Sequence, residues 1–165
     1  MLHLRLKQRC LHPAGFKKES VVSLPNPFSM MPSADKPLIV YVDDDEEDRF
    51  LLSDALSVTT PEFDVQTLPD GTAALDFLYS YKNNLPCLVI VDLNMPGMNG
   101  KELIKRIREE ALFDSLPVVA FTTSSSNIDR LECAHYNVDM VTKPITFSEL
   151  QNTVRQLTRY CNTTA

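Results

Sequence analysis

The stretch CLVIVDLNMPGMNG, residues 87–100, places one aspartate, Asp92, at the end of an apolar run and follows it with a proline and two glycines. The run is too uniformly apolar for a strand with one wet face, so we expect a strand that is buried on both faces of a sheet. Proline and glycine then predict a tight loop. A buried strand that delivers one carboxylate to a rigid loop needs a functional explanation.

Four further apolar runs alternate with amphipathic segments on either side of this stretch. Strands are predicted at residues 38–42, 63–68, 87–92, 117–122 and 138–142. Helices are predicted after Asp45 and at residues 70–81, 101–110, 127–136 and 146–160. The alternation of five strands with five helices predicts an α/β fold, in which a doubly wound, five-stranded parallel sheet carries helices on both faces.

Caps and periodicity define the predicted helices more closely. Asp45 can cap the first helix, and either Thr146 or Ser148 can cap the last. In the first helix, apolar residues recur at helical spacing: Phe50, Leu51, Leu52, Ala55 and Leu56. In residues 101–110 one face is apolar and the other charged, which is typical of a surface helix; the apolar residues are Leu103, Ile104 and Ile107.

The composition limits the class of protein. With 165 residues, of which 44% are hydrophobic, the chain can form one domain with a real core. Residues 1–34 hold five basic side chains and one glutamate and therefore carry about +4, so the remainder of this chain of net charge −6 carries about −10. An acidic body argues against a nucleic-acid surface. No apolar run approaches the roughly 20 residues that span a bilayer, so we expect no membrane segment.

The four cysteines, Cys10, Cys87, Cys133 and Cys161, are scattered along the chain. They form no C-x-x-C pair and have no matching histidine spacing. The sequence therefore predicts neither a disulfide framework nor a zinc site, and a reducing, cytoplasmic setting is the expectation.

Residues 1–34 contain four prolines and show little periodicity beyond an alternation of leucines at their start. We interpret them as a disordered or spurious extension, with a start at Met30 or Met31 as one way in which it could arise. A basic organelle-targeting segment is the alternative, weakened by the prolines and Glu19. The expected organisation is this extension, a domain at residues 35–161 and a short tail at residues 162–165.

In an open parallel sheet, ligands bind at the carboxyl ends of the strands. The polar residues predicted there are Asp43 and Asp44, Asp92, Thr122 and Lys143. Neighbouring carboxylates repel each other by about 4 kcal/mol per pair at an effective dielectric constant near 20, so the cluster needs compensating charge. Lys143 supplies one charge, and Mg²⁺, which prefers oxygen ligands, could supply two more.

Such a cluster has the parts needed to accept a phosphoryl group. Asp92 could act as a carboxylate nucleophile, as in the formation of aspartyl phosphates. Thr122, Lys143 and the metal could each contact one phosphoryl oxygen. The acids that follow the pair, from Asp45 to Asp48, are interpreted only as a solvated helix start that the helix dipole favours.

The chain resembles the receiver domain of two-component response regulators. The resemblance rests on YVDDD at residues 41–45, VDLNMPGMNG at 91–100, FTT at 121–123 and TKP at 142–144, in the family's order and spacing over residues 38–160. It implies a flavodoxin-like receiver fold. The most similar members would be stand-alone, chemotaxis-regulator-like receivers, because only a few residues follow the last predicted helix.

The resemblance also implies a role for each site residue. Asp44, Asp92 and the backbone carbonyl of Asn94 would bind Mg²⁺ directly, and Asp43 would act mostly through a bound water. Asp92 would take the phosphoryl group from a histidine kinase or phosphotransfer partner. Thr122 and Lys143 would bind that group, and Pro144 would typically follow a cis peptide bond. Movement of Thr122 would then re-pose the face built from the fourth helix, fifth strand and fifth helix.

Two positions depart from the common family pattern. Met140 stands where many members carry an aromatic switch residue, so it is a possible output switch of a different kind. Ile145 replaces a frequent phenylalanine. A constitutive binding module that keeps the fold without switching is therefore the alternative function.

The leading hypothesis is a non-enzymatic signalling relay that acts through an unknown downstream protein, without nucleic acid or membrane. A phosphatase or phosphotransferase would need an acid two residues after the nucleophile. That position holds Asn94, which cannot protonate a leaving group.

Overall fold

The computed structural model describes residues 36–162. The predictions for residues 1–34 and 163–165 lie outside the described residues. In chain order the strands are β1 (Leu38–Val42), β2 (Asp64–Leu68), β3 (Leu88–Val91), β4 (Val118–Thr122) and β5 (Asp139–Thr142). The helices are α1 (Glu46–Thr59), α2 (Gly71–Ser80), α3 (Gly100–Glu109), α4 (Asn127–His135) and α5 (Phe147–Leu157), with short 3₁₀ helices η1 (Ala111–Phe113) and η2 (Thr158–Asn162).

The five strands form one parallel sheet in the order β2-β1-β3-β4-β5. The chain runs outward from β1 to β2, then returns past β1 to β3 and continues in the opposite direction. The order therefore reverses between β1 and β3, and the carboxyl ends of these two strands are neighbours. The predicted doubly wound sheet is confirmed.

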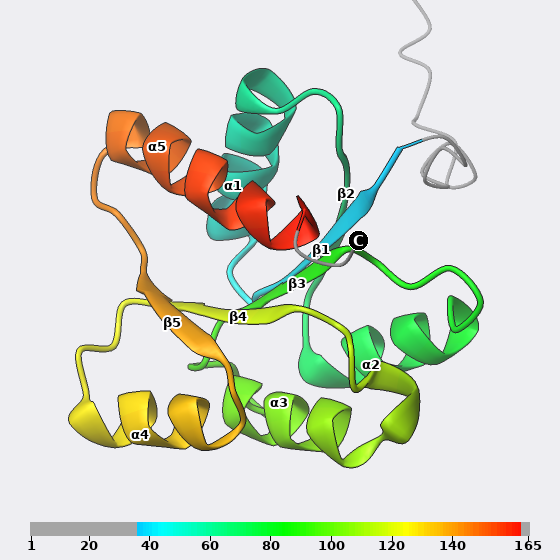
Figure 1. The fold of residues 1–165 in the computed structure, drawn as a ribbon. Helices are drawn as coiled ribbons and strands as arrows, with labels where there is room; N and C mark the ends of the chain where they lie inside the picture. The colour runs from blue at the N-terminus through cyan, green and yellow to red at the C-terminus, as the bar shows by residue number, and fades with distance from the viewer. Residues whose placement is uncertain (1–35, 163–165) are drawn as a thin grey trace, which may run out of the picture.

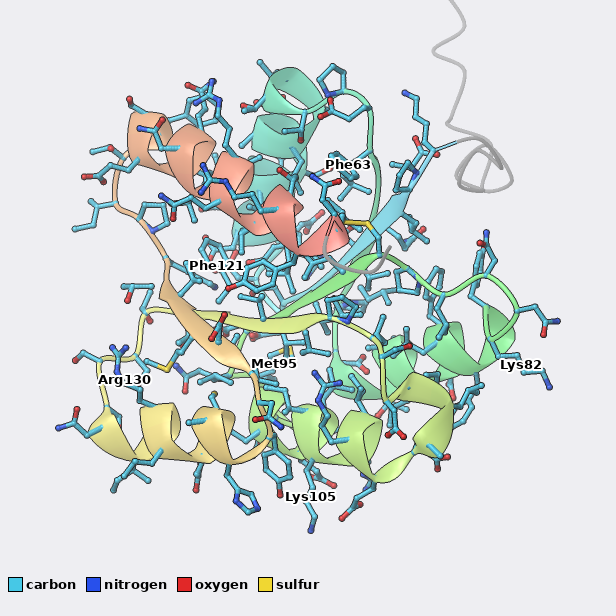
Figure 2. All side chains as sticks on the ribbon, in the orientation of Figure 1. Phe63, Lys82, Met95, Lys105, Phe121 and Arg130 are labelled. Carbon is cyan, nitrogen blue, oxygen red and sulfur yellow. A yellow bond between two sulfur atoms is a disulfide. The ribbon has the colours of Figure 1, made fainter. Side chains whose placement is uncertain are left out.

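Helices cover both faces of the sheet. Figure 1 shows α1 and α5 on one face and α2, α3 and α4 on the other. Alternate residues of β1 divide between two cores: Ile39 and Tyr41 pack with α1 and α5, while Val40 and Val42 pack with α2 and α3. Figure 2 shows Phe121 and Met95 on these opposite sides of the sheet. All residues of β1, β3 and β4 are buried. For β3 this is what the uniformly apolar run at residues 87–92 predicted.

Local capping explains where the helices begin. The Asp45 carboxylate accepts hydrogen bonds from the backbone N–H groups of Glu47 and Asp48, at 2.8 and 3.3 Å. Of the two candidate caps for α5, the structure selects Thr146, which forms a capping box with Glu149. The chain leaves the α-helical conformation after Leu157 and continues as η2, so α5 is shorter than predicted.

Two residues of the first helix lie on the face opposite to the core. Leu52, Ala55 and Leu56 are buried, whereas Phe50 is 70% exposed and Leu51 is 45% exposed. Only the apolar residues near the middle of α1 reach the sheet, because the five apolar positions span more than one face of the helix. Among residues 36–162, no helix has both the length and the apolar content that crossing a bilayer requires.

The prediction of no disulfide was wrong. Cys87, just before β3, is bonded to Cys161 in η2. The two residues are separated by 74 positions, so no local cysteine spacing could predict the bond. The parallel topology of the sheet brings them together. Within the described part of the chain, the remaining cysteine, Cys133, is free and buried.

Candidate functional site

Four strands deliver polar residues to one edge of the sheet. Asp43 and Asp44 follow β1, Asp92 follows β3, Thr122 ends β4 and Lys143 comes directly after β5. One carboxylate oxygen from each of the three aspartates lies within 4.8 Å of the others. The structure therefore brings together the acidic residues that the sequence placed at this edge.

Asp43 is almost fully buried, and both of its carboxylate oxygens accept hydrogen bonds. Its Oδ1 accepts from the backbone N–H of Asp45 at 2.9 Å. Its Oδ2 accepts from Lys143 Nζ at 2.6 Å and from the Tyr41 hydroxyl. Burial, followed by the hydrogen bond to Asp43, raises the pKa of Tyr41 above its ordinary value, so the hydroxyl stays a proton donor.

Tyr41 was not among the predicted site residues. It lies in β1 two positions before Asp43, and side chains two apart in a strand share a face. The signal was a hydroxyl-bearing residue inside the otherwise aliphatic run LIVYV. The Tyr41 hydroxyl, by donating to Asp43 Oδ2, helps to fix the orientation of the Asp43 carboxylate.

Asp92 is 6% exposed at the centre of the edge. Its Oδ2 accepts a hydrogen bond from the backbone N–H of Asn94 at 3.3 Å, and its Oδ1 lies 3.8 Å from Lys143 Nζ. Burial raises the pKa of Asp92 above its ordinary value; Lys143 opposes this effect and the Asp43 carboxylate adds to it. Asp92 is thus a desolvated carboxylate whose cationic partner, Lys143, lies farther from it than from Asp43 and Asp48.

The closest ion pairs of Lys143 are formed with acids other than Asp92. Its ammonium contacts Asp43 at 2.6 Å and Asp48 at 2.7 Å. Burial alone would lower the pKa of Lys143, but the hydrogen bonds to these two carboxylates, together with the charge of Asp92, raise it. The interpretation of Asp48 as only a solvated helix-start acid was therefore wrong, because the first turn of α1 lies against the end of β5.

Thr122 and Asn94 join β4 to the loop after β3. The fully buried Thr122 hydroxyl accepts hydrogen bonds from Asn94 Nδ2 at 3.3 Å and from the backbone N–H of Ser124 at 3.2 Å. The backbone N–H of Lys143 donates to the Thr122 carbonyl at 3.0 Å. The sequence pointed only to the backbone carbonyl of Asn94, so this side-chain contact was missed.

The loop after Asp92 is shaped by two glycines with different roles. Gly97 has a φ of 72°, which favours glycine, but open space surrounds it. At Gly100, the first residue of α3, a Cβ atom would lie 2.1 Å from the Asp92 carbonyl oxygen. Helix α3 therefore begins in direct contact with the backbone of Asp92, and only glycine allows this approach.

The remaining residues that the sequence singled out lie in β5 and directly after it. Met140 pairs with Ala120 across β5 and β4 and packs, partly buried, against the core on the α2, α3 and α4 face. Pro144 lines a small hollow with Tyr41 and Phe121. Ile145, the second departure from the family pattern, is almost fully exposed.

The donor set fits a hard divalent cation. Three carboxylates and a single ammonium leave an excess of negative charge, and their oxygens are close enough to share one ion. Arg49 does not neutralise these carboxylates directly, because its guanidinium donates to the backbone carbonyls of Asp43 and Asp44, at 2.7 and 3.0 Å.

Comparisons with known proteins agree with this geometry. The family model for the response regulator receiver domain matches residues 39–155. The chain is 31% identical to a probable methanogenesis regulatory protein, FilR2 of Methanothrix harundinacea, over 74% of this chain and 82% of that protein. Two other curated relatives are longer: the match spans 52% of the response regulator Rre1 of Synechocystis sp. and 12% of the sensor histidine kinase TmoS of Ectopseudomonas mendocina.

Solved structures show the same fold over nearly their whole length. The phosphorylated cyanobacterial phytochrome response regulator RcpA is 29% identical, with a TM-score of 0.70 over 79% of this chain and 96% of that chain. The Mn²⁺-bound form of response regulator Rcp1 is 28% identical, with a TM-score of 0.68 over 78% and 96%. The expected flavodoxin-like receiver fold is confirmed. With its matched sequence, sheet order and acidic edge, this chain belongs to the response regulator receiver domain family, whose members accept phosphoryl groups in two-component signalling.

Proposed function

We propose that Asp92 accepts a phosphoryl group from a sensor histidine kinase or a histidine phosphotransfer protein, in a reaction that depends on Mg²⁺. The observation that carries this proposal is the placement of Asp92: it is buried, it belongs to the acidic cluster, and Lys143 contacts it at 3.8 Å, a longer distance than to Asp43 or Asp48. Such a carboxylate is available as a nucleophile.

In the proposed reaction, a carboxylate oxygen of Asp92 attacks phosphorus and the P–N bond to the donor histidine breaks. The electron pair of that bond stays on the imidazole, which takes up a proton. Asp43, Asp44, Asp92 and the Asn94 carbonyl would hold Mg²⁺, which when bound neutralises charge on the phosphoryl oxygens. The Mn²⁺-bound form of response regulator Rcp1, which has the same fold, supports the binding of a divalent cation here.

Thr122 and Lys143 would bind the phosphoryl oxygens. For Lys143 this requires a change of partner, because its ammonium is nearer to Asp43 and Asp48 than to Asp92. For Thr122 it requires only that the hydroxyl turn its own proton toward the new anion, because the contact with Asn94 Nδ2 uses a lone pair of the oxygen and can be kept. Both changes are local events that the end of β4 and the start of α4 can transmit.

We further propose that residues 35–161 form the receiver and signal through protein contacts of the α4-β5-α5 face. Ile128 and Leu131, both on α4, are 67% and 72% exposed, which supports a protein-binding surface there. Met140, on β5, lies between this face and the core, where its flexible side chain can adjust to movement.

The test is the mass of the intact chain after incubation with a small phosphodonor, such as acetyl phosphate, and Mg²⁺. We expect one added phosphoryl group in the natural chain and none in Asp92→Asn or in the natural chain with a chelator. Glu47→Gln, which changes an exposed acid in the first turn of α1, is the matched control and should label normally. Labelling of Asp92→Asn at the natural rate would refute the assignment.

A further inference from the structure

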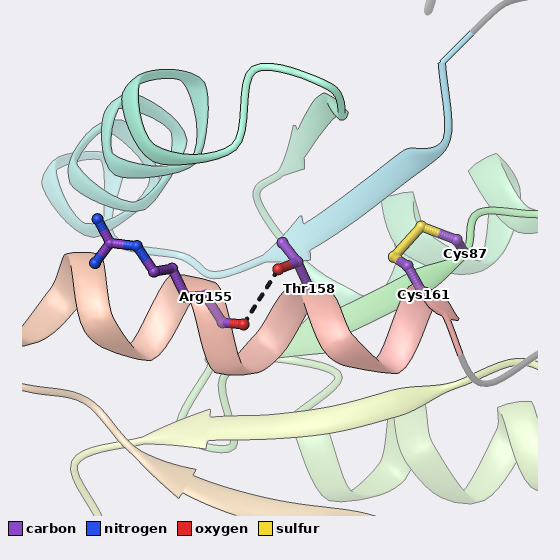
Figure 3. The surroundings of a disulfide bond; sticks show 4 residues. All are labelled: Cys87, Arg155, Thr158 and Cys161. Carbon is purple, nitrogen blue, oxygen red and sulfur yellow. Dashed lines mark hydrogen bonds between the residues drawn. A yellow bond between two sulfur atoms is a disulfide. The ribbon is translucent and has the colours of Figure 1, made fainter.

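The end of β3 opposite to Asp92 carries different chemistry. Cys87 precedes the first residue of β3, and Cys161 lies in η2, at the end of the last helix (Figure 3). Their Cα atoms are 4.8 Å apart, which is within the usual range for bonded cysteines. The two sulfurs therefore meet without any displacement of the backbone.

The bond closes a ring that begins at β3 and ends at η2. The ring includes Asp92, Thr122 and Lys143, while Asp43 and Asp44 lie outside it on the earlier part of the chain. A covalent link between these two points fixes α5 and η2 to the centre of the sheet. It lies at the amino edge and makes no contact with the acidic cluster.

Non-covalent contacts also hold the two cysteines in place. The backbone N–H of Cys87 donates to the Leu38 carbonyl at 2.8 Å, and Leu157 and Thr158 are buried. The Thr158 hydroxyl donates to the Arg155 carbonyl at 3.3 Å, which fastens the last turn to α5 (Figure 3). The Tyr160 hydroxyl donates to Asp139 on β5. With these contacts in place, the thiols would remain within reach of each other when the bond is open.

Exposure separates this pair from the free cysteine. Cys87 and Cys161 are only partly buried and pack at the margin of the core under α1 and α5, so a small reagent can reach them. Cys133 is 2% exposed, and burial, followed by the charge of Asp129, raises the pKa of its thiol. Cys133 is therefore an internal reference that should react slowly.

We propose that Cys87 and Cys161 are a reversible redox pair that takes a low-molecular-weight disulfide, such as glutathione disulfide, as its oxidant. One cysteine thiolate attacks the glutathione disulfide and expels one glutathione thiolate, which gives a mixed disulfide. The second cysteine thiolate attacks the protein sulfur and expels the other. Two cysteine thiols are oxidised, one glutathione disulfide is reduced to two glutathione molecules, and the two protons pass to these products.

The bond would make the chain respond to the redox state of its surroundings, independently of Asp92. When closed it locks η2 and the end of α5 onto β3; when open it leaves them held by the weaker contacts alone. This inference does not rest on the proposed phosphorylation, because neither cysteine touches a residue of that site.

The first experiment is peptide mapping of the full chain after equilibration with glutathione buffers of increasing oxidation. Trypsin releases Cys87 in residues 83–101 and Cys161 in residues 160–165. We expect these peptides to be linked at oxidising ratios, separate at reducing ratios, and linked again on return. Cys133→Ala should behave in the same way. Failure of the link to form, or failure of excess reduced glutathione to open it, overturns the proposal.

The second experiment is hydrogen exchange of the same samples, in the natural chain and in Cys161→Ser. We expect exchange in residues 158–162 of the natural chain to accelerate by about tenfold or more on reduction, because local opening becomes easier. Cys161→Ser should show the faster exchange in both buffers. Equal exchange of the oxidised and reduced natural chain in this segment would show that the bond locks nothing.

Discussion

The two ends of β3 are organised by opposite principles. At the carboxyl end, Asp92 lies among like charges in a buried setting, and a lysine and backbone groups only partly compensate for this. At the amino end, Cys87 lies against an apolar core and is held by a covalent bond. The carboxyl end stores unfavourable electrostatics that a divalent cation can relieve. The amino end stabilises the same strand through the disulfide, which carries no charge and so does not respond to a bound ion.

This difference indicates how one four-residue strand can serve a reactive site. The strand itself is fully buried and paired on both sides, so its position is fixed by packing rather than by the groups at its ends. The carboxyl end can then carry a costly cluster of acids. The covalent link at the amino end adds stability at a distance from the chemistry.

Removal of the covalent link should have the largest effect on stability. Under non-reducing conditions, Cys161→Ser is expected to lower the free energy of unfolding by about 3–4 kcal/mol, because the bond closes a long loop in the unfolded chain. The measurement is urea denaturation of the natural chain and the variant, with and without a reductant.

The reductant supplies the control for this comparison. With the bond reduced, the natural chain and Cys161→Ser should unfold at nearly the same urea concentration, since the remaining difference is one hydroxyl in place of one thiol. If the two already coincide without a reductant, the amino end of β3 is not stabilised by the link, and the proposed contrast between the two ends fails.

The contact between α3 and Asp92 should come second. Gly100→Ala places a Cβ atom 2.1 Å from the Asp92 carbonyl oxygen, so α3 must shift, and we expect a loss of about 3 kcal/mol in the free energy of unfolding. The same shift should weaken Mg²⁺ binding, measured by calorimetric titration. Gly97→Ala is the matched control: it meets open space, and its positive φ should cost only about 1 kcal/mol with Mg²⁺ affinity retained.

The carboxyl end of β3 was largely predictable from sequence because its chemistry follows strand ends. Asp43, Asp44, Asp92, Thr122 and Lys143 each come at or after the end of an apolar run, and parallel strands bring such positions to one edge. All five strands and five helices were predicted, with boundaries that moved by a few residues where β2 starts later and α5 ends earlier.

What sequence did not reveal depends on contacts between distant elements. The contact of Asp48 with Lys143 requires the packing of α1 beside β5, and the pair Cys87–Cys161 requires the return of the last helix over the sheet. Tyr41 looked like an ordinary strand residue because its hydroxyl matters only once Asp43 is buried beside it. Periodicity identifies buried faces, but it does not identify which polar groups meet behind them.

The smallest expected effect is a gain in stability at the carboxyl end. Burial raises the pKa of Asp92 in the folded chain above its ordinary value of 3.8, so near neutral pH the ionised carboxylate destabilises the fold. Without divalent cations, Asp92→Asn should therefore increase the free energy of unfolding by about 1 kcal/mol. The gain should vanish as the pH falls through the raised pKa, because the natural carboxyl group is then protonated and neutral too.

Magnesium should reverse the sign of this gain. A cation that binds only the folded natural chain adds to its stability in proportion to the logarithm of its concentration, and the variant, which lacks one ligand carboxylate, should gain less. Urea denaturation at several pH values, each with Mg²⁺ and with a chelator, measures both effects.

The control is Glu47→Gln, which changes an exposed acid in the first turn of α1. This variant should lose a few tenths of a kcal/mol in the free energy of unfolding through the helix dipole and keep the full response to Mg²⁺. A variant Asp92→Asn that is less stable than the natural chain in chelator at neutral pH would show that this end of β3 stores no electrostatic cost, and the contrast with the disulfide end would then need another basis.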